Sequence, residues 1–172
     1  MHYALNCTED VSRLRTIIVR ETLKDLWIAF YGHIQHYKEL WKIKCIFIHA
    51  DGHLAIFNTA FREICDSRST EFVITPSRTP EINGPGERTN GVLTQTVRCM
   101  ILGSKLPKSF WSVVLLAACY ITNRTITTGL QPEMTPIKKA RKLLFLDSET
   151  NLKPDVSNLR VYGCRARYRP GG

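Results

Sequence analysis

The sequence has no long hydrophobic run. Its longest uninterrupted apolar stretch, Val113 to Ile121, is nine residues, whereas a membrane-spanning helix needs about 20. Residues 1–16 also lack the apolar segment of a secretory signal peptide. The sequence therefore predicts an intracellular protein without a transmembrane helix.

Closely spaced metal-binding or disulfide-forming cysteines are also missing. The six cysteines include no C-x-x-C pair, which argues against a zinc site and against a disulfide framework. We expect all six to be buried small hydrophobic residues: Cys7, Cys45, Cys65, Cys99, Cys119 and Cys164. Two histidine pairs, His33 with His36 and His49 with His53, have no third ligand nearby, so surface or strand-end positions are favoured over metal binding.

Acidic residues are few compared with basic ones. Asp and Glu total 15 against 24 Lys and Arg, which gives a net charge of +9 and a pI of about 9.5. Such a balance favours a polyanionic partner, but it does not separate nucleic acid from an acidic membrane surface. With 172 residues, 44% of them hydrophobic, the chain is long enough for one ordinary domain and a tail.

The first half of the chain shows alternating strand and helix patterns. Tyr3 to Cys7 and Arg15 to Val19 are predicted to form a hairpin. Thr22 to Trp41 begins with a capping box and repeats apolar residues at helical spacing, so it is predicted to be an amphipathic helix. The β-branched run Ile43 to His49 is predicted to be a buried strand, and a strand–helix–strand connection of this length requires a partly parallel sheet.

The middle of the chain continues this pattern. Asn58 to Asp66 is a predicted helix and Glu71 to Thr75 a predicted strand. Thr75 to Gly84, rich in turn formers, is predicted to be an irregular loop that can close over a substrate. A helix should then run from Pro85 to Gly103, because proline is favoured at the first helical position.

The last third is first apolar and then basic. Leu106 to Arg124 is a predicted helix that is apolar almost all round, which indicates burial at a domain or subunit interface. Beyond Thr125 the chain is expected to be basic and mostly irregular. Its cluster Lys138 to Lys142 fits a solvated tail and a phosphate-contacting segment equally well.

Two acids stand at positions that can carry chemistry. Asp51 follows the predicted strand, at the edge where open α/β sheets place their active sites, and Glu87 lies in the first turn of the predicted helix. Spacing alone leaves other interpretations open. Asp51 can be a strand-end turn residue, and Glu87 can be a glutamate favoured by the helix dipole.

Three sequence blocks narrow this choice. They are TPSRTPEINGPGER ending at Arg88, LPKSFW from Leu106, and KPDVSNLRVYGCRARY from Lys153 to Tyr168. Together they resemble the integrase catalytic core of a copia-type LTR retrotransposon, part of a Pol polyprotein, over about Tyr3 to Tyr168. The resemblance implies an α/β, ribonuclease-H-like mixed sheet with flanking helices. It also implies that residues 1–124 form an N-terminally truncated core and that residues 125–172 form a basic C-terminal extension.

In that family three carboxylates hold two divalent metal ions, Mg²⁺ or Mn²⁺, for phosphoryl transfer to DNA. Asp51 and Glu87 match the second and third acids, and are thereby the candidate catalytic and metal-binding residues. The first acid would lie on a central strand upstream of Tyr3, which this sequence does not contain. Asp10 is the nearest substitute, but it fits a turn aspartate better.

That missing strand should leave two open sheet edges. We therefore expect the hairpin either to close onto the Ile43 to His49 strand or to be detached and weakly packed.

The resemblance also implies DNA as partner. Candidate phosphate contacts are Arg88, Arg98, Lys105 and Lys108, each of which could equally be a solvated surface charge. Self-association through Leu106 to Arg124 and a nuclear location would follow from an integrase role. Two interpretations remain: an integrase core that is inactive with one acid missing, or a non-catalytic DNA-binding or interaction module derived from a retrotransposon. A third is that the complete protein, with an upstream strand, is an active transferase.

Overall fold

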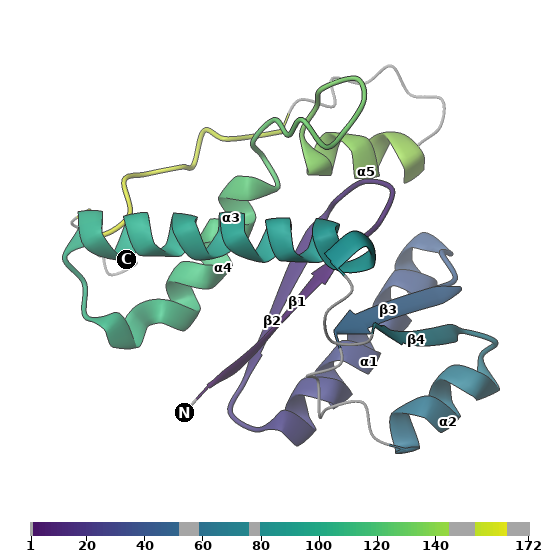
Figure 1. Ribbon diagram of the computed structural model, residues 1–172. Coiled ribbons are helices and arrows are strands. Elements are labelled where there is room, and N and C mark those ends of the chain that lie inside the picture. Colours follow the sequence, from purple (N-terminus) through teal and green to yellow (C-terminus); the bar gives the residue numbers. More distant parts are fainter. Residues whose placement is uncertain (1, 52–58, 76–79, 145–153, 165–172) are drawn as a thin grey trace, which may run out of the picture. The chain divides into compact units, whose positions relative to one another are not determined.

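The computed structural model describes residues 2–51, 59–75, 80–144 and 154–164. The chain divides into two compact units (Figure 1). The first consists of Met1–Thr8 and Thr16–Asn90, and the second of Glu9–Arg15 and Gly91–Gly172. No helix among the described residues is long and apolar enough to span a bilayer.

The predicted hairpin is present. Strands β1 (Tyr3–Thr8) and β2 (Arg15–Arg20) form a two-stranded sheet, and the Glu9 N–H donates to the Leu14 carbonyl, 2.8 Å away, across the turn. The Glu9 carboxylate accepts hydrogen bonds from the backbone N–H groups of Val11 (2.9 Å) and Ser12 (2.6 Å). One acidic side chain therefore fixes the shape of this turn.

Helix α1 (Leu23–Trp41) confirms the predicted amphipathic helix. Thr22 is its N-cap, because the Thr22 hydroxyl accepts from the Asp25 N–H at 3.1 Å and donates to the Asp25 carboxylate at 2.6 Å. The helix ends where Lys42 adopts a left-handed conformation.

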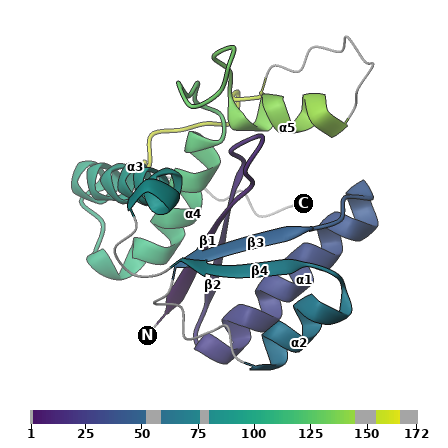
Figure 2. The ribbon, with the colours of Figure 1, turned by 45° about the vertical axis from the view of Figure 1, so that its right-hand side comes forward.

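Strands β3 (Phe47–Asp51) and β4 (Glu71–Thr75) form a parallel pair, connected through α2 (Thr59–Ser67) (Figures 1 and 2). The prediction for β4 is confirmed, but the predicted strand Ile43 to His49 is misplaced. Pairing starts only where the Glu71 N–H donates to the Ile46 carbonyl, 2.9 Å away. Ile43 and Ile46 are 41% and 68% exposed, so the first part of the predicted strand is not buried, whereas Ile48 within β3 is.

The core of the first unit lies beneath both sheets. Leu26 and Phe30 of α1 pack with Phe61 of α2, which is 1% exposed, and with Leu5 and Ile18 of the hairpin. The hairpin does not share a sheet with β3 in the described residues, yet it is well packed. The expected closure onto the Ile43 to His49 strand is therefore wrong, and the expected detachment is observed without the weak packing, because α1 supplies apolar side chains to the two sheets at once.

Helix α3 (Pro80–Ser104) begins earlier than expected. The region predicted to be a loop up to Gly84 is helical from Pro80, and the part from 76 to 79 lies outside the described residues. Proline at the first helical position is again the start signal, but at the earlier of two prolines. Further along, Leu93 is buried while Thr94 and Arg98 are exposed, so this part of α3 has one buried and one exposed face.

The second unit adds a 3₁₀ turn (Lys108–Phe110), α4 (Trp111–Thr122) and α5 (Pro136–Leu144). The first two replace the single helix predicted for Leu106 to Arg124. The third lies in the region expected to be mostly irregular. The core of the second unit includes Leu93, Val114, Ala118, Cys119, Leu130 and Met134.

Candidate functional site

Asp51 is the last residue of β3 and is paired with Thr75, the last residue of β4. Because the two strands are parallel, both residues stand at the carboxyl end of the pair, the edge where open α/β sheets place their ligands. The backbone position predicted for Asp51 is thus observed. Its side chain lies outside the described part of the structure.

Glu87 lies in α3, seven residues after its first residue, Pro80. This is about two turns into the helix, so the predicted first-turn position is wrong. The electrostatic benefit of an acid near a helix N-terminus fades within the first turn, and therefore does not explain Glu87. Its side chain, like that of Asp51, is not among those described, and the proximity of the two carboxylates stays a prediction.

The donor chemistry fits a hard divalent cation, since Mg²⁺ prefers carboxylate and water oxygens. Asp51 and Glu87 would supply two such groups. Among the side chains that the structure describes, which do not include those of Asp51 and Glu87, no cluster of three or more His, Cys, Asp or Glu could hold a metal ion. His33 instead packs edge-on against the ring of Tyr37, with 4.6 Å between ring centroids.

The expectation that all cysteines are buried is only partly right. Cys65 and Cys119 are buried and Cys7 and Cys45 half-buried, but Cys99 and Cys164 are exposed. Cys99 lies on the solvent side of α3, a position that its small apolar side chain tolerates.

Asp10 has the structural role expected of it. Its carboxylate forms a 2.7 Å ion pair with the Arg13 guanidinium inside the β1–β2 turn. Glu9, which carries the backbone bonds of the same turn, was not singled out from the sequence. A glutamate three residues before a serine is too common a pattern to predict that the glutamate side chain accepts backbone hydrogen bonds in a turn.

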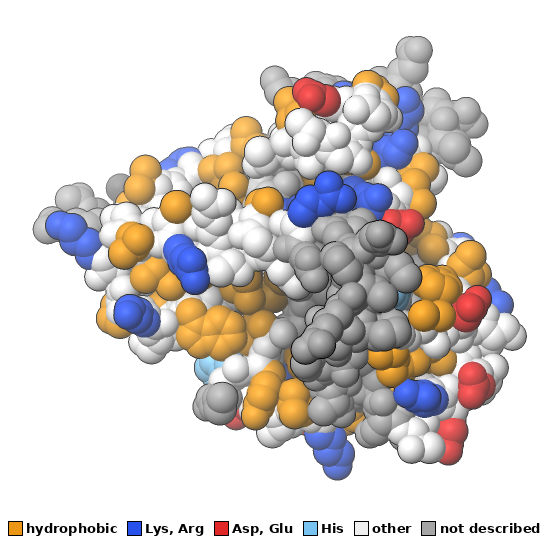
Figure 3. Space-filling model, viewed as in Figure 1, with side chains coloured by type: hydrophobic (Ala, Val, Ile, Leu, Met, Phe, Trp, Pro, Cys, Tyr) orange, Lys and Arg blue, Asp and Glu red, His pale blue; other side chains and the backbone are white. Residues whose placement is uncertain are grey.

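The four candidate DNA-contacting residues, Arg88, Arg98, Lys105 and Lys108, are all exposed. Arg98, Lys105 and Lys108 form no salt bridge with any described residue. The face shown in Figure 3 carries more Lys and Arg side chains (blue) than Asp and Glu (red). Arg98, Lys105 and Lys108 are thus available to an anionic partner.

Helix α5 adds a basic element whose helical form the sequence prediction missed. Its sequence PIKKARKLL has four cations and no acid. Lys138 and Lys142 are both exposed and stand four residues apart, a spacing at which like charges destabilise a helix. The sequence did contain a signal for the start of α5, namely Thr135 followed by Pro136. The Thr135 hydroxyl accepts a hydrogen bond from the Lys138 N–H at 3.2 Å, and Pro136 is the first residue of the helix.

In sequence, the chain is similar to polyproteins of mobile elements. The chain is 36% identical over 106 residues, 62% of its length, to the retrovirus-related Pol polyprotein from transposon TNT 1-94 of Nicotiana tabacum. It is 31% identical over 105 residues, 61% of its length, to that from transposon RE1 of Arabidopsis thaliana. The matches cover only 7% and 6% of those polyproteins. No protein-family model matches the chain.

One solved structure shares the fold at a TM-score above 0.5. A chain in the cryo-EM structure of the simian T-cell lymphotropic virus intasome with PP2A regulatory subunit B56 gamma superposes with a TM-score of 0.57. It has 16% identity, and the match covers 96% of this chain and 64% of that one. The HTLV-2 integrase catalytic core domain in complex with magnesium gives a TM-score of 0.49 at 18% identity, over 74% and 86% of the two chains.

The predicted resemblance to a retrotransposon integrase core is therefore confirmed. The chain is related in sequence to the Pol polyproteins of plant retrotransposons and has a ribonuclease-H-like α/β fold, shared with a chain of the simian T-cell lymphotropic virus intasome.

Proposed function

We propose that this chain is a DNA-binding, integrase-like core in which Asp51 and Glu87 are ligands of a divalent cation. The observation that carries the proposal is the position of Asp51, at the carboxyl end of a parallel strand pair, in a relative of Pol polyproteins. The edge formed there by Asp51 and Thr75 is a place where ligands bind in open α/β sheets.

A divalent cation at this edge would stabilise the negative charge that develops on oxygen in phosphoryl transfer. The carboxylates of Asp51 and Glu87 would hold and orient it. Two protein ligands leave most of the coordination shell to water, so the cation would be weakly and imprecisely held. We therefore propose that these 172 residues do not join DNA ends by themselves.

The joining proposal is tested with a labelled DNA end, a target duplex and Mg²⁺ or Mn²⁺. We expect no strand-transfer product and no 3′-end processing. Metal-dependent joining that disappears in an Asp51→Asn variant would contradict the proposed inactivity while supporting the assigned site.

DNA binding is supported by the net charge of +9 and by the exposed cations Arg98, Lys105 and Lys108 of the second unit. Each cation that neutralises a phosphate releases counterions, which makes affinity depend steeply on salt. The basic helix α5 supplies further positive charge without an acidic neighbour in its own sequence.

Fluorescence anisotropy of a labelled duplex at several salt concentrations measures this contribution. Replacing Arg98 and Lys108 by glutamine should lower the slope of log affinity against log salt by about 2, since each phosphate that is no longer neutralised reduces it by roughly 0.9. A matched variant, Arg20→Gln with Lys24→Gln, removes the same charge from exposed positions and should keep the slope. Equal slopes in the two variants would exclude the assigned contacts.

The second candidate is a non-catalytic DNA-binding module. The charge of α5, which has four cations and no acid, favours it. The two candidates differ in the effect of Mg²⁺. If Asp51 and Glu87 hold a cation at the DNA, the Asp51→Asn, Glu87→Gln variant should lose the Mg²⁺-dependent part of DNA affinity, whereas a simple binding module should show no such part.

Self-association through α4 is a further part of the proposal. Val113 and Leu116 of this helix are 53% and 46% exposed and stand three residues apart, so they share a face. Sedimentation velocity should show a concentration-dependent dimer that Leu116→Lys abolishes. Unchanged sedimentation of that variant would rule out this face.

A further inference from the structure

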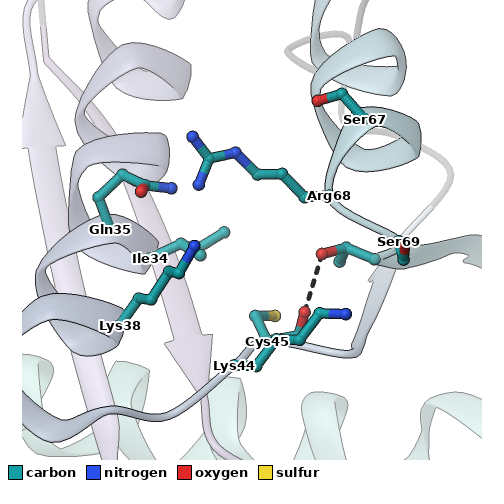
Figure 4. Close-up of a pocket in the computed structure, with 9 residues that line it drawn as sticks. Ile34, Gln35, Lys38, Lys44, Cys45, Ser67, Arg68 and Ser69 are labelled. Carbon is teal, nitrogen blue, oxygen red and sulfur yellow. Dashed lines mark hydrogen bonds between the residues drawn. The ribbon is translucent and has the colours of Figure 1, made fainter.

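The first unit has a pocket of about 600 Å³ at the end of the β3–β4 pair opposite to Asp51. One wall comes from α1, one from the residues just before β3, and one from the turn between α2 and β4 (Figure 4). Its lining consists of Ile34, Gln35, Lys38, Lys44, Cys45, Ser67, Arg68, Ser69 and Thr70. Because the strands are parallel, their amino ends form this pocket while their carboxyl ends carry Asp51 and Thr75.

The backbone of the pocket is held by a helix-ending motif. The Thr70 N–H donates to the Cys65 carbonyl at 3.0 Å and the Ser69 N–H to the Asp66 carbonyl at 3.1 Å, which is the Schellman pattern. Ser69 takes the left-handed conformation that this pattern needs, with φ of 52°. The Thr70 hydroxyl then donates to the Cys45 carbonyl at 2.8 Å, which ties the turn to the segment before β3 (Figure 4).

The lining is positively charged. Lys38, Lys44 and Arg68 contribute three cations, and none of the nine lining residues is acidic. None of these three cations forms a salt bridge with a described residue. Like charges brought to one concave site repel each other unless an anion is present, so the pocket is electrostatically suited to a negative ligand.

Arg68 is oriented for binding. Its guanidinium donates a hydrogen bond to the Tyr31 hydroxyl and lies 5.0 Å from the centre of the Tyr31 ring. One of its N–H donors is used in this way, which fixes the side chain while others remain for a ligand. Figure 4 shows Gln35 and Lys38 reaching from α1 toward the same space as Arg68.

Two neutral groups complete the site. The Nε2 atom of Gln35 is buried and has no hydrogen-bond partner among the described residues, an unfavourable arrangement that an acceptor in the pocket would relieve. Burial raises the pKa of the Cys45 thiol, which therefore stays uncharged at neutral pH and does not repel an anion.

We propose that this pocket binds the phosphate group of an anionic ligand through Lys38, Lys44, Arg68 and the side-chain amide of Gln35. Its volume lies in the range of small-molecule sites and is larger than one phosphate needs. The phosphate can belong to a free phosphorylated compound or to a nucleic-acid backbone. The site is separate from the Asp51 edge, and the inference does not depend on the proposed function.

Thermal unfolding with added pyrophosphate tests the proposal, with sodium chloride at the same ionic strength to account for screening. Pyrophosphate should raise the melting temperature of the unsubstituted chain. In a Lys38→Gln, Lys44→Gln variant its affinity should fall at least tenfold. The variant Arg20→Gln with Lys24→Gln removes two charges elsewhere and should respond like the unsubstituted chain.

A local signal and a competition experiment complete the test. In a ¹⁵N-labelled sample the side-chain NH₂ resonances of Gln35 should shift as pyrophosphate binds. Displacement of a labelled duplex by pyrophosphate, absent in the Lys38→Gln, Lys44→Gln variant, would identify a DNA phosphate as the ligand. Gln35 shifts without displacement would identify a free phosphorylated compound. No binding of either probe, or equal pyrophosphate binding by the lysine variant, would overturn the proposal.

Discussion

At the scale of single residues, one amide organises the second unit. The Asn123 side chain is 8% exposed and forms two hydrogen bonds with the backbone of Arg15. Its Oδ1 accepts from the Arg15 N–H at 2.9 Å, and its Nδ2 donates to the Arg15 carbonyl at 2.8 Å. Residues 108 positions apart are thereby joined without an ion pair.

Replacing this amide should destabilise the chain. Asn123→Ala leaves a backbone donor and acceptor of Arg15 unpaired, which should lower the free energy of unfolding by about 1–3 kcal/mol. Asn123→Asp should lower it further, because a carboxylate would face the Arg15 carbonyl. Urea unfolding measures both, and Asn158→Ala, at an exposed position, should stay within about 0.5 kcal/mol of the unsubstituted chain.

His33 should make stability depend on pH. Burial, and then the nearby His36, lower the pKa of His33 in the folded chain. As the pH falls below about 6.5, the unfolded chain takes up a proton at this position that the folded chain does not, so stability is lost. His33→Gln should therefore reduce the loss of unfolding free energy between pH 7 and pH 5. An unchanged difference between the two pH values would contradict the assignment.

The sequence predicted the position of a residue in the fold only where neighbouring residues determine that position. Asp51 was placed at a strand end because the strand pattern around it is local. Glu87 was placed in the wrong turn because Pro80 and Pro85 both satisfy the preference for proline at a helix start, and nothing local chooses between them. The exposed Cys99 shows that residue type alone does not determine burial.

At the scale of elements, α1 was predicted almost to the residue and β3 was not. The start of α1 is set by the Thr22 cap and its length by its own apolar repeat, both visible in the sequence. The start of β3 is set by its partner, since pairing begins at the bond from Glu71 to Ile46. The β-branched residues before Phe47 therefore favoured a strand that has no neighbour to pair with among the described residues.

The cap of α1 gives a prediction at this scale. Thr22→Ala removes the hydroxyl that accepts from the Asp25 N–H, and should lower the unfolding free energy by about 1 kcal/mol. Thr22→Ser keeps the hydroxyl and should restore most of it. Thr94→Ala, at an exposed position inside α3, should be neutral or slightly stabilising because alanine is the better helix former. Equal losses in Thr22→Ala and Thr22→Ser would mean that the cap is not the source of the effect.

At the scale of the whole molecule, the chain consists of two compact units, and the strands of the first form two separate sheets. The sequence pattern predicted an α/β fold, and the resemblance specified which one. Neither could predict how α1 would cover both sheets, because that depends on apolar side chains from distant segments meeting in one core. The relatives establish a similarity in sequence to retrotransposon Pol polyproteins, and the proposed pairing of Asp51 with Glu87 is the step that connects this similarity to chemistry.

Paramagnetic broadening by Mn²⁺ tests that step most directly, because it detects weakly held ions. In a ¹⁵N-labelled chain, low concentrations of Mn²⁺ should broaden the amide signals around Asp51 and around Glu87 together. Either Asp51→Asn or Glu87→Gln should abolish the broadening at both places. Broadening around only one of the two acids, or broadening that persists at the second acid when the first is replaced, would contradict a shared metal site.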